Sequence, residues 1–187
     1  AVTGRLKGAQ LAVLPFTQMT LRRWFELHPN GRVLQPDGTD PANFDVTGRF
    51  ERGESRGELT RTDPKSWEEK SWVLGVEVGA SSRAYDWNLL RRQRVINDEL
   101  GGRPLVLVLA LDEKSFAVFE RPAGVRVTLD GDTLVVGDKR YDFSGRELSA
   151  PQVSGPGSRP SALKPVPASQ EFWHSWRTFH PGTFRAG

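Results

Sequence analysis

Residues 105–111 read Leu-Val-Leu-Val-Leu-Ala-Leu, the longest apolar run in the chain. The run is too short for a membrane-spanning helix, which needs about 20 residues. It suits a strand that is buried on both of its faces. We therefore expect a central strand here, with the rest of the fold built outward from it.

Strand patterns surround this run, at residues 72–78, 116–120, 125–129, 133–136 and 140–143. Asp130-Gly131-Asp132 and Gly137-Asp138-Lys139 separate the last three and supply the residues that tight antiparallel reversals need. Residues 86–100 allow either a short helix that ends at Gly101-Gly102 or a strand at Val95-Ile96. The sequence thus predicts a mainly β (α+β) fold with an antiparallel sheet or a barrel-like core.

Two short amphipathic helices complete the expected fold. One covers about residues 18–28, with Thr17 as its N-cap and Pro29 to stop it, and the other covers about residues 170–179. Between them, a stretch rich in Gly, Asp, Glu and Arg predicts a long irregular arm. We expect three parts, at residues 1–35, 36–66 and 67–187, of which the second is the arm and the third is β-rich.

The two helical stretches are related by a constant offset of 152 residues. A Trp-x-x-x-His-Pro motif occurs in both, and residues four apart lie on the same face of a helix. Each stretch therefore presents a Trp beside a His just before a proline. The identical pairs are Leu11 with Leu163, Pro15 with Pro167, Gln18 with Gln170, Trp24 with Trp176, His28 with His180 and Pro29 with Pro181.

The repeated motif allows two interpretations. In the first, each His packs on its Trp near the negative end of the helix dipole and marks the end of its helix. In the second, His28 and His180 serve a metal-assisted or acid-base enzyme, which requires their rings within about 5 Å of each other or of one ion. We favour the first interpretation, and we assign no catalytic residue, metal ligand or cofactor.

Other side chains offer contacts for a ligand or a partner. The densest basic group suits an anion, unless its guanidinium groups belong to separate ion pairs. An aromatic set suits a sugar-like or apolar ligand, although large aromatic side chains are more often core. These candidates are Arg91, Arg92 and Arg94 in the basic group, and Trp67, Trp72 and Trp87, with Tyr85, in the aromatic set.

Two acidic motifs have structural explanations. Asp112-Glu113 falls in an expected turn, where solvated carboxylates are more common than a catalytic pair. Asn97-Asp98-Glu99 precedes two glycines, and Asn and Asp side chains often satisfy backbone donors at turns. We expect a solvated turn at the first motif and a structural polar cluster at the second.

Composition excludes several classes of protein. The 187 residues carry a net charge of +3, from 26 basic and 23 acidic side chains, and include no Cys. A disulfide scaffold, a zinc-thiolate site and a thiol nucleophile are therefore absent. Basic and acidic residues are interspersed and no nucleic-acid-reading motif occurs, which argues against a nucleic-acid partner. No apolar run predicts a membrane span.

Several segments resemble one known family, the bacterial and archaeal proteins grouped as domain of unknown function 3179. The resemblance implies a β-rich domain of exported or membrane-tethered proteins, and so a periplasmic or extracellular location. It also implies that residues 1–35 are the tail of a preceding copy of the domain. The segments are Val73-Leu74-Gly75-Val76, Ala84-Tyr85, residues 95–106 (Val-Ile-Asn-Asp-Glu-Leu-Gly-Gly-Arg-Pro-Leu-Val), residues 117–121, residues 141–146 and the Trp and His-Pro ending at residues 163–181.

One difference from the family concerns chemistry. Many members are expected to carry a cysteine-containing loop directly after the strand equivalent to residues 105–109, and here that loop reads Ala110-Leu111-Asp112-Glu113-Lys114-Ser115. Without sulfur the loop supplies neither a nucleophile nor a redox couple. We therefore expect a non-catalytic extracytoplasmic binding or assembly module, an accessory subunit that packs on a protein partner such as a membrane-bound complex or an upstream repeat domain.

Overall fold

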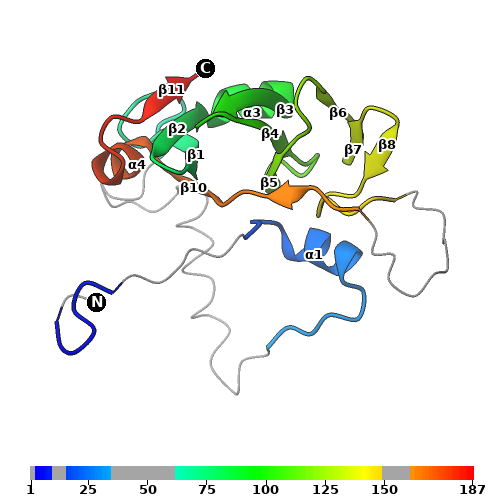
Figure 1. The fold of residues 1–187 in the computed structure, drawn as a ribbon, viewed down its shortest axis with the longest axis horizontal. Coiled ribbons are helices and arrows are strands. Elements are labelled where there is room, and N and C mark those ends of the chain that lie inside the picture. Colours follow the sequence, from blue (N-terminus) through cyan, green and yellow to red (C-terminus); the bar gives the residue numbers. More distant parts are fainter. Residues whose placement is uncertain (1–2, 10–15, 35–61, 149–160) are drawn as a thin grey trace.

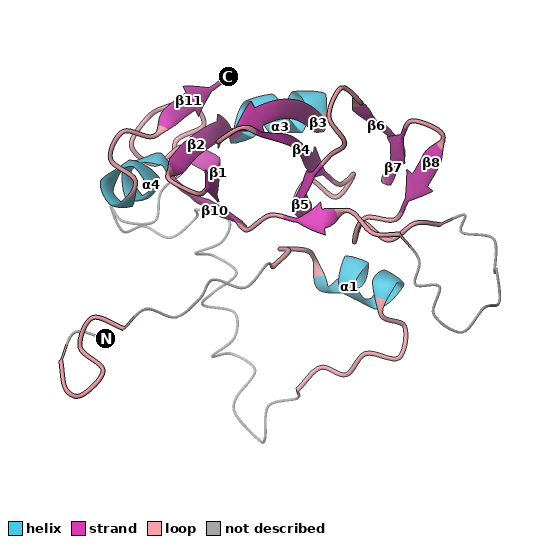
Figure 2. Cartoon of the chain, viewed as in Figure 1, coloured by secondary structure: helices cyan, strands magenta, loops and turns pink. Residues whose placement is uncertain are grey.

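The computed structural model describes residues 3–9, 16–34, 62–148 and 161–187. In these residues, three sheets and three helices make a mainly β, α+β fold (Figures 1 and 2). Residues 36–61 of the expected arm, and Leu11 and Pro15 of the repeat, lie outside the described residues. No helix in the described part of the chain is long and apolar enough to cross a membrane.

The first sheet has the strand order β10-β1-β2-β11, and the second has the order β3-β4-β5-β9. The third is the meander β6-β7-β8, and every pairing is antiparallel except that of β11 with β2. The elements are α1 (Leu21–Leu27), β1 (Trp72–Val78), β2 (Ser81–Asp86), α3 (Trp87–Gln93), β3 (Val95–Leu100), β4 (Arg103–Leu109), β5 (Phe116–Glu120), β6 (Val127–Asp130), β7 (Thr133–Val136), β8 (Lys139–Tyr141), β9 (Lys164–Pro165), β10 (Ala168–Phe172), α4 (Trp173–Phe179) and β11 (Phe184–Ala186).

Strand β4 is the central strand that the apolar run predicted. It lies between β3 and β5, and its residues 105–109 are fully buried. Successive side chains of a strand point to opposite faces. Leu105, Leu107 and Leu109 accordingly enter a core shared with the first sheet, whereas Val106 and Val108 enter a core shared with the third. The second sheet thus stands between the other two (Figure 1).

Glycines close the hairpins around this centre. The two-residue turns begin at Gly101, Gly131 and Gly137, whose φ angles are 57°, 60° and 63°. Glycine adopts positive φ at little cost, which two-residue hairpins require. The turns at Gly131 and Gly137 were predicted. Gly101 closes the β3–β4 hairpin rather than ending a helix, because residues 86–100 form both α3 and β3.

The barrel-like alternative is wrong. The described strands form three separate sheets, and none of these sheets closes on itself. The predicted helix starts are also wrong by three residues. Helix α4 begins at Trp173 because residues 168–172 pair with β1, and α1 begins at Leu21 with Thr20 as its N-cap because Gln18 bridges Phe116 of β5. In both places pairing with a distant strand overrides the local helical pattern.

Helix α4 covers the outer face of the first sheet. Its Trp173 and Trp176 are 4% and 3% exposed and pack against Val73 and Ala84. The indole of Trp176 lies directly on Gly75 of β1, where a Cβ atom would stand 2.2 Å from the ring. A glycine in a strand often marks such a close approach. Gly75 therefore sets how near the helix comes to the sheet.

A polar cluster ties β2 of the first sheet to β3 of the second. The Tyr85 hydroxyl donates to Asp98 at 2.9 Å, and Arg83 donates to the same carboxylate and to the carbonyl oxygen of Glu99. Burial alone would raise the pKa of Asp98, but the hydrogen bonds from Arg83, the Glu99 backbone N–H and Tyr85 outweigh it and lower that pKa. Burial and the neighbouring carboxylate raise the pKa of Tyr85.

The motif at residues 97–99 is structural, as the sequence predicted, although it lies on a strand rather than at a turn. Its first residue, Asn97, donates to the carbonyl oxygen of Val127 at 2.8 Å and accepts from the backbone N–H of the same residue at 2.7 Å. Asn97 thereby ties β3 to β6 of the third sheet.

Gly75→Ala should destabilise the fold by about 1–3 kcal/mol, the usual cost of overpacking a core. Because the added methyl group meets the Trp176 ring, the cost should fall when Trp176 is replaced by Leu. Denaturant unfolding of the wild type, the two single variants and the double variant measures this coupling. An equal cost in both backgrounds would show that the strain arises elsewhere.

Asp98→Asn should destabilise the fold at pH 7 by about 1–3 kcal/mol, because a charged hydrogen-bond acceptor is lost. Since the pKa of Asp98 is lowered in the folded state, its ionised form stabilises the fold above the unfolded value of about 3.9. That contribution disappears as the pH falls through the lower folded value. Urea unfolding from pH 7 to pH 2 should show the variant and the wild type converging. Asp138→Asn, in the exposed β7–β8 turn, is the matched control and should unfold like the wild type at pH 7.

Candidate functional site

The two Trp–His units end their helices in the same way. His28 and His180 are the C-caps of α1 and α4, with φ and ψ of −131° and 68° in one and −126° and 67° in the other. Each donates its backbone N–H to the carbonyl oxygen of its own Trp. The imidazole centroids lie 5.3 Å from Trp24 and 3.6 Å from Trp176. Each His therefore packs on its Trp where its helix ends.

The two helices that end at His28 and His180 lie in different parts of the fold. Helix α4 is at the outer side of the first sheet, whereas α1 lies on the other side of the β9–β10 strand segment (Figure 1). In His180, Nδ1 is 3.1 Å from the Trp176 carbonyl oxygen and Nε2 is 3.1 Å from a Glu77 carboxylate oxygen. The described residues contain no group of three or more His, Asp or Glu side chains that could hold a metal ion. The contacts that the described residues make with either ring join neither His28 to His180 nor both to a common side chain.

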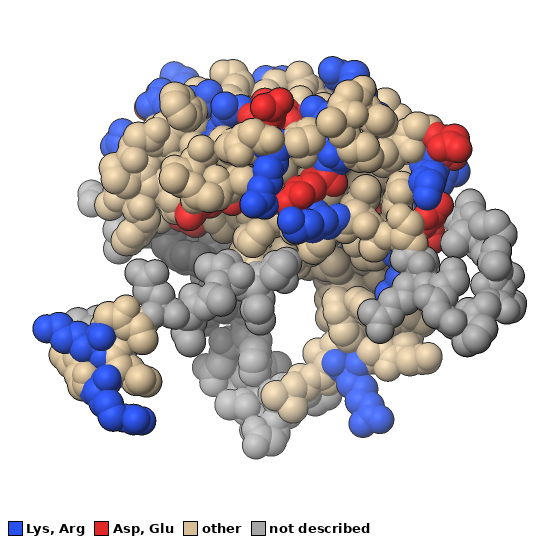
Figure 3. Space-filling view, viewed as in Figure 1, with Lys and Arg blue, Asp and Glu red and all other residues tan. Residues whose placement is uncertain are grey.

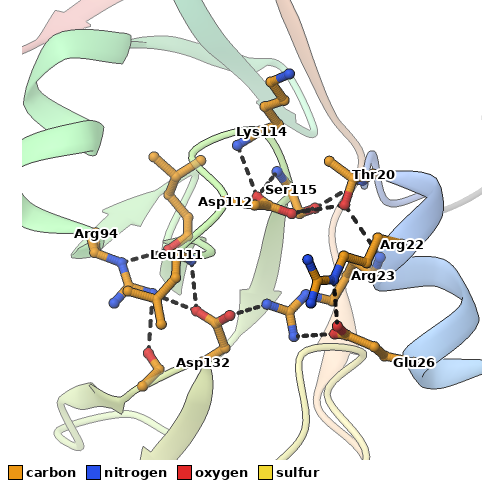
Figure 4. Close-up of polar contacts among 12 residues, drawn as sticks. Thr20, Arg22, Arg23, Glu26, Arg94, Leu111, Asp112, Lys114, Ser115 and Asp132 are labelled. Carbon is orange, nitrogen blue, oxygen red and sulfur yellow. Dashed lines mark hydrogen bonds and ion pairs between the residues drawn. The ribbon is translucent and has the colours of Figure 1, made fainter.

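The loop at residues 110–115 holds the N-terminal segment in place (Figure 4). Asp112 accepts hydrogen bonds from the Thr20 hydroxyl at 2.9 Å and from the Ser115 hydroxyl and backbone N–H at 2.6 and 2.7 Å. The Ser115 hydroxyl oxygen in turn accepts from the Thr20 backbone N–H at 2.9 Å. Burial would raise the pKa of Asp112, but the hydrogen bonds from Ser115, Lys114 and Thr20 lower it. The turn is as predicted, but Asp112 is half-buried rather than solvated.

A second carboxylate, Asp132, joins α1 to the end of α3. One of its oxygens accepts from Arg23 of α1, and the other accepts from Arg94 and from the backbone N–H of Leu111 (Figure 4). Its side chain is only 13% exposed. Hydrogen bonds between ionised partners are about twice as strong as neutral ones. Asp132 therefore anchors α1 by charge as well as by geometry.

The three arginines of the basic group point to different partners. Arg91 pairs with Glu113 and Arg94 pairs with Asp132, while Arg92 is exposed and has no partner among the described residues. Basic and acidic side chains are also interspersed on the surface that Figure 3 shows. Separate ion pairs weaken the hypothesis of an anion site formed by all three arginines.

The aromatic set is divided between two places. Trp67 packs edge-on against Trp173 at 5.4 Å, beside α4. Trp72 and Trp87 instead line one pocket of about 260 Å³, together with Arg91. Three of the six predicted contact residues thus share a pocket. Tyr85 is fully buried and belongs to the cluster with Asp98.

Sequence analysis missed the residues that fix α1, namely Thr20, Arg23, Ser115 and Asp132. The Thr20–Asp112 and Arg23–Asp132 contacts join positions 92 and 109 residues apart. Local signals existed only for the turn, in which Asp112 accepts from backbone and hydroxyl groups two and three residues later. The contacts across the fold leave no local pattern.

The fold and these contacts define a mainly β, α+β protein in which a loop and a hairpin hold an N-terminal helix. The family model described as "Protein of unknown function (DUF3179)" matches residues 1–183. The chain therefore belongs to that family, as its motifs indicated. No curated protein and no solved structure matches the chain.

Asp132→Ala should loosen α1, because it removes the carboxylate that Arg23 and Arg94 share. We expect hydrogen exchange of the α1 amides to accelerate at least about tenfold, while the amides of β4 keep their protection. Hydrogen–deuterium exchange with mass spectrometry measures both. Asp130→Ala, at an exposed position of the same hairpin, is the matched control. Unchanged exchange in α1 of the Asp132 variant would contradict the anchoring role.

Proposed function

We propose that this chain is a non-catalytic binding or assembly module that acts outside the cytoplasm as an accessory subunit. In this proposal the exposed apolar face of α1, formed by Leu21 and Phe25, contacts a protein partner. The observation that carries the proposal is the contrast in burial between α1 and α4.

The contrast in burial is seen when positions 152 residues apart are compared. Leu21 is 55% exposed, whereas its counterpart Trp173 is 4% exposed. Phe16 is 49% exposed, whereas its counterpart Ala168 is 5% exposed. Helix α4 reaches this burial by lying on a sheet, and α1 has no such sheet against Leu21 in the described parts of the chain. Exposed apolar patches of this kind are typical of sites that bind other proteins.

Gene duplication explains why the two helices are comparable. Their bounds and their C-cap angles correspond at the offset of 152 residues, which supports an ancestral unit that was copied. Helix α4 then indicates what such a unit binds, because its Trp rests on a strand glycine. A partner that presents a sheet face to α1, such as another copy of the domain or a subunit of a membrane-bound complex, would bury Leu21 as the first sheet buries Trp173.

The polar side chains of the loop at residues 110–115, of the β6–β7 turn and of the end of α4 support a non-catalytic role. Asp112, Asp132 and His180 are engaged in hydrogen bonds that hold elements of the fold together. The chain has no Cys to act as a nucleophile. No contact between described residues favours the enzyme hypothesis based on His28 and His180. The extracytoplasmic location draws its support from the family resemblance.

The double variant Leu21→Glu/Phe25→Glu should lose its partner while keeping its fold, because both side chains lie on an exposed surface. Tagged protein is purified from the cell envelope of its native organism, and the captured proteins are quantified by mass spectrometry. We expect at least about a tenfold loss of one specific protein, since two buried charges oppose association. Phe179→Glu, on the exposed side of α4, is the matched control and should retain the partner.

Capture of the same proteins by wild type and double variant would contradict the proposal. Metal analysis of the same samples tests the enzyme hypothesis. A stoichiometric metal ion that is lost in both His28→Ala and His180→Ala would support that hypothesis instead.

A further inference from the structure

A groove runs between α3 and the loop at residues 110–115. Its inner part has a volume of about 260 Å³ and is lined by Trp72 and Trp87. It opens into a wider outer part of about 600 Å³, and Asn88, Arg91 and Glu113 line both parts. The inner part is slightly smaller than most small-molecule sites, whose volumes are about 300–1,000 Å³. It therefore has room for a single ring rather than for a large ligand.

Three polar groups between the two parts have unused hydrogen-bonding capacity. Asn88 donates its amide hydrogens to the Pro64 carbonyl oxygen at 3.0 Å and the Ser66 hydroxyl at 3.1 Å, which leaves its Oδ1 atom as an acceptor. Both Nε and Nη2 of Arg91 donate to the same oxygen, Oε2 of Glu113. Nη1 of Arg91 and Oε1 of Glu113 therefore have no partner among the described residues, and a donor stands beside an acceptor.

The aromatic wall of the groove is fixed by packing. Trp72 stacks on Phe172 with centroids 4.2 Å apart, and Trp87 meets Phe116 edge-on at 5.8 Å. Trp87 is only 8% exposed. Neither indole must be ordered when a ligand enters, so the wall is preorganised and binding avoids that entropic cost.

Charge is nearly balanced in the inner part of the groove, where Arg91 and Lys114 face Asp63, Asp112 and Glu113, whereas Lys65 and Arg92 make the outer part basic. Arg91 and Glu113 neutralise each other within the groove, so the pair exerts little net attraction on either a cation or an anion. A neutral ligand with adjacent hydroxyl groups uses both free atoms, since one hydroxyl donates to Oε1 of Glu113 and the other accepts from Nη1 of Arg91. Hydrogen bonds to ionised groups are the stronger kind, and such a ligand makes two of them.

We propose that this groove binds a single neutral sugar ring. Two neighbouring hydroxyls of the sugar engage the Arg91–Glu113 pair, and its apolar C–H face lies against Trp72 and Trp87. This proposal assigns the sugar-like ligand that the sequence suggested for the aromatic residues to the groove beside Trp72 and Trp87. The site is separate from the α1 surface, so it does not depend on the proposed function.

The test is a nuclear magnetic resonance titration of the full chain with glucose, galactose and N-acetylglucosamine in separate samples. At least one of the sugars should shift the indole N–H signals of Trp72 and Trp87 saturably. Arg91→Gln and Glu113→Gln should each weaken that binding at least about tenfold, because each removes one ionised hydrogen-bond partner. Arg103→Gln is the matched control, since Arg103 is as exposed as Arg91 and also pairs with a glutamate, Glu120.

Three results would overturn the proposal. They are the absence of a saturable shift with all three sugars, equal binding by the Arg91 variant and the Arg103 control, and saturation by inorganic phosphate alone. The last would identify an anion site. The Leu21→Glu/Phe25→Glu protein should bind sugar as the wild type does, so a failure of the proposed protein contact does not affect this result.

Discussion

The two faces of β4 determine how the rest of the molecule is placed. Leu105, Leu107 and Leu109 fill the core beneath the first sheet, and Val106 and Val108 fill the core beneath the third. A slip of one residue would exchange these two sets, and side chains of the wrong size would then enter both cores at once. The Gly101-Gly102 turn fixes the strand at one end, and at the other end the chain passes directly into the loop at residues 110–115. The register of β4 therefore also positions Asp112 and Ser115, on which α1 depends.

The sequence correctly predicted the strands in which apolar residues follow a regular pattern and are buried. The predicted strands at residues 72–78, 116–120 and 133–136 have the observed bounds, because their alternation and the turns beside them agree. Strand β2 begins with Ser81, Ser82 and Arg83, which carry no apolar signal, and it forms because β1 pairs with it. The candidate site residues also fall into a group that the sequence predicted and a group that it did not. Trp72, Trp87 and Arg91 were recognisable as ligand contacts by residue type, whereas Asp132 became relevant only when the β6–β7 turn met α1 and α3.

The loop after β4 shows how polar residues that resemble catalytic groups serve the fold. The Asp112 carboxylate and the Thr20 and Ser115 hydroxyls resemble a proton-transfer site, but both hydroxyls donate to the carboxylate and the Thr20 backbone N–H donates to Ser115. These bonds lower the pKa of Asp112, which keeps the carboxylate ionised and suited to accepting hydrogen bonds rather than to acid catalysis.

Helices α1 and α4 differ in residue type at equivalent positions, as well as in whether a sheet covers them. On α4, position 177 carries an arginine that is 44% exposed and pairs with Glu69 at the surface. The corresponding position of α1 carries Phe25, which is 39% exposed and touches Trp24 edge-on at 5.1 Å. On α4 the position equivalent to Phe25 is polar, and the exposed apolar residue of α4 is Phe179, at the position equivalent to Leu27. By contrast, α1 is apolar both at the position that α4 buries, where Leu21 replaces Trp173, and at the position where α4 exposes Arg177. The exposed apolar surface of α1 thus combines Leu21 and Phe25 one turn apart on the same face, which supports the proposed contact of this helix with a partner as well as with its own domain.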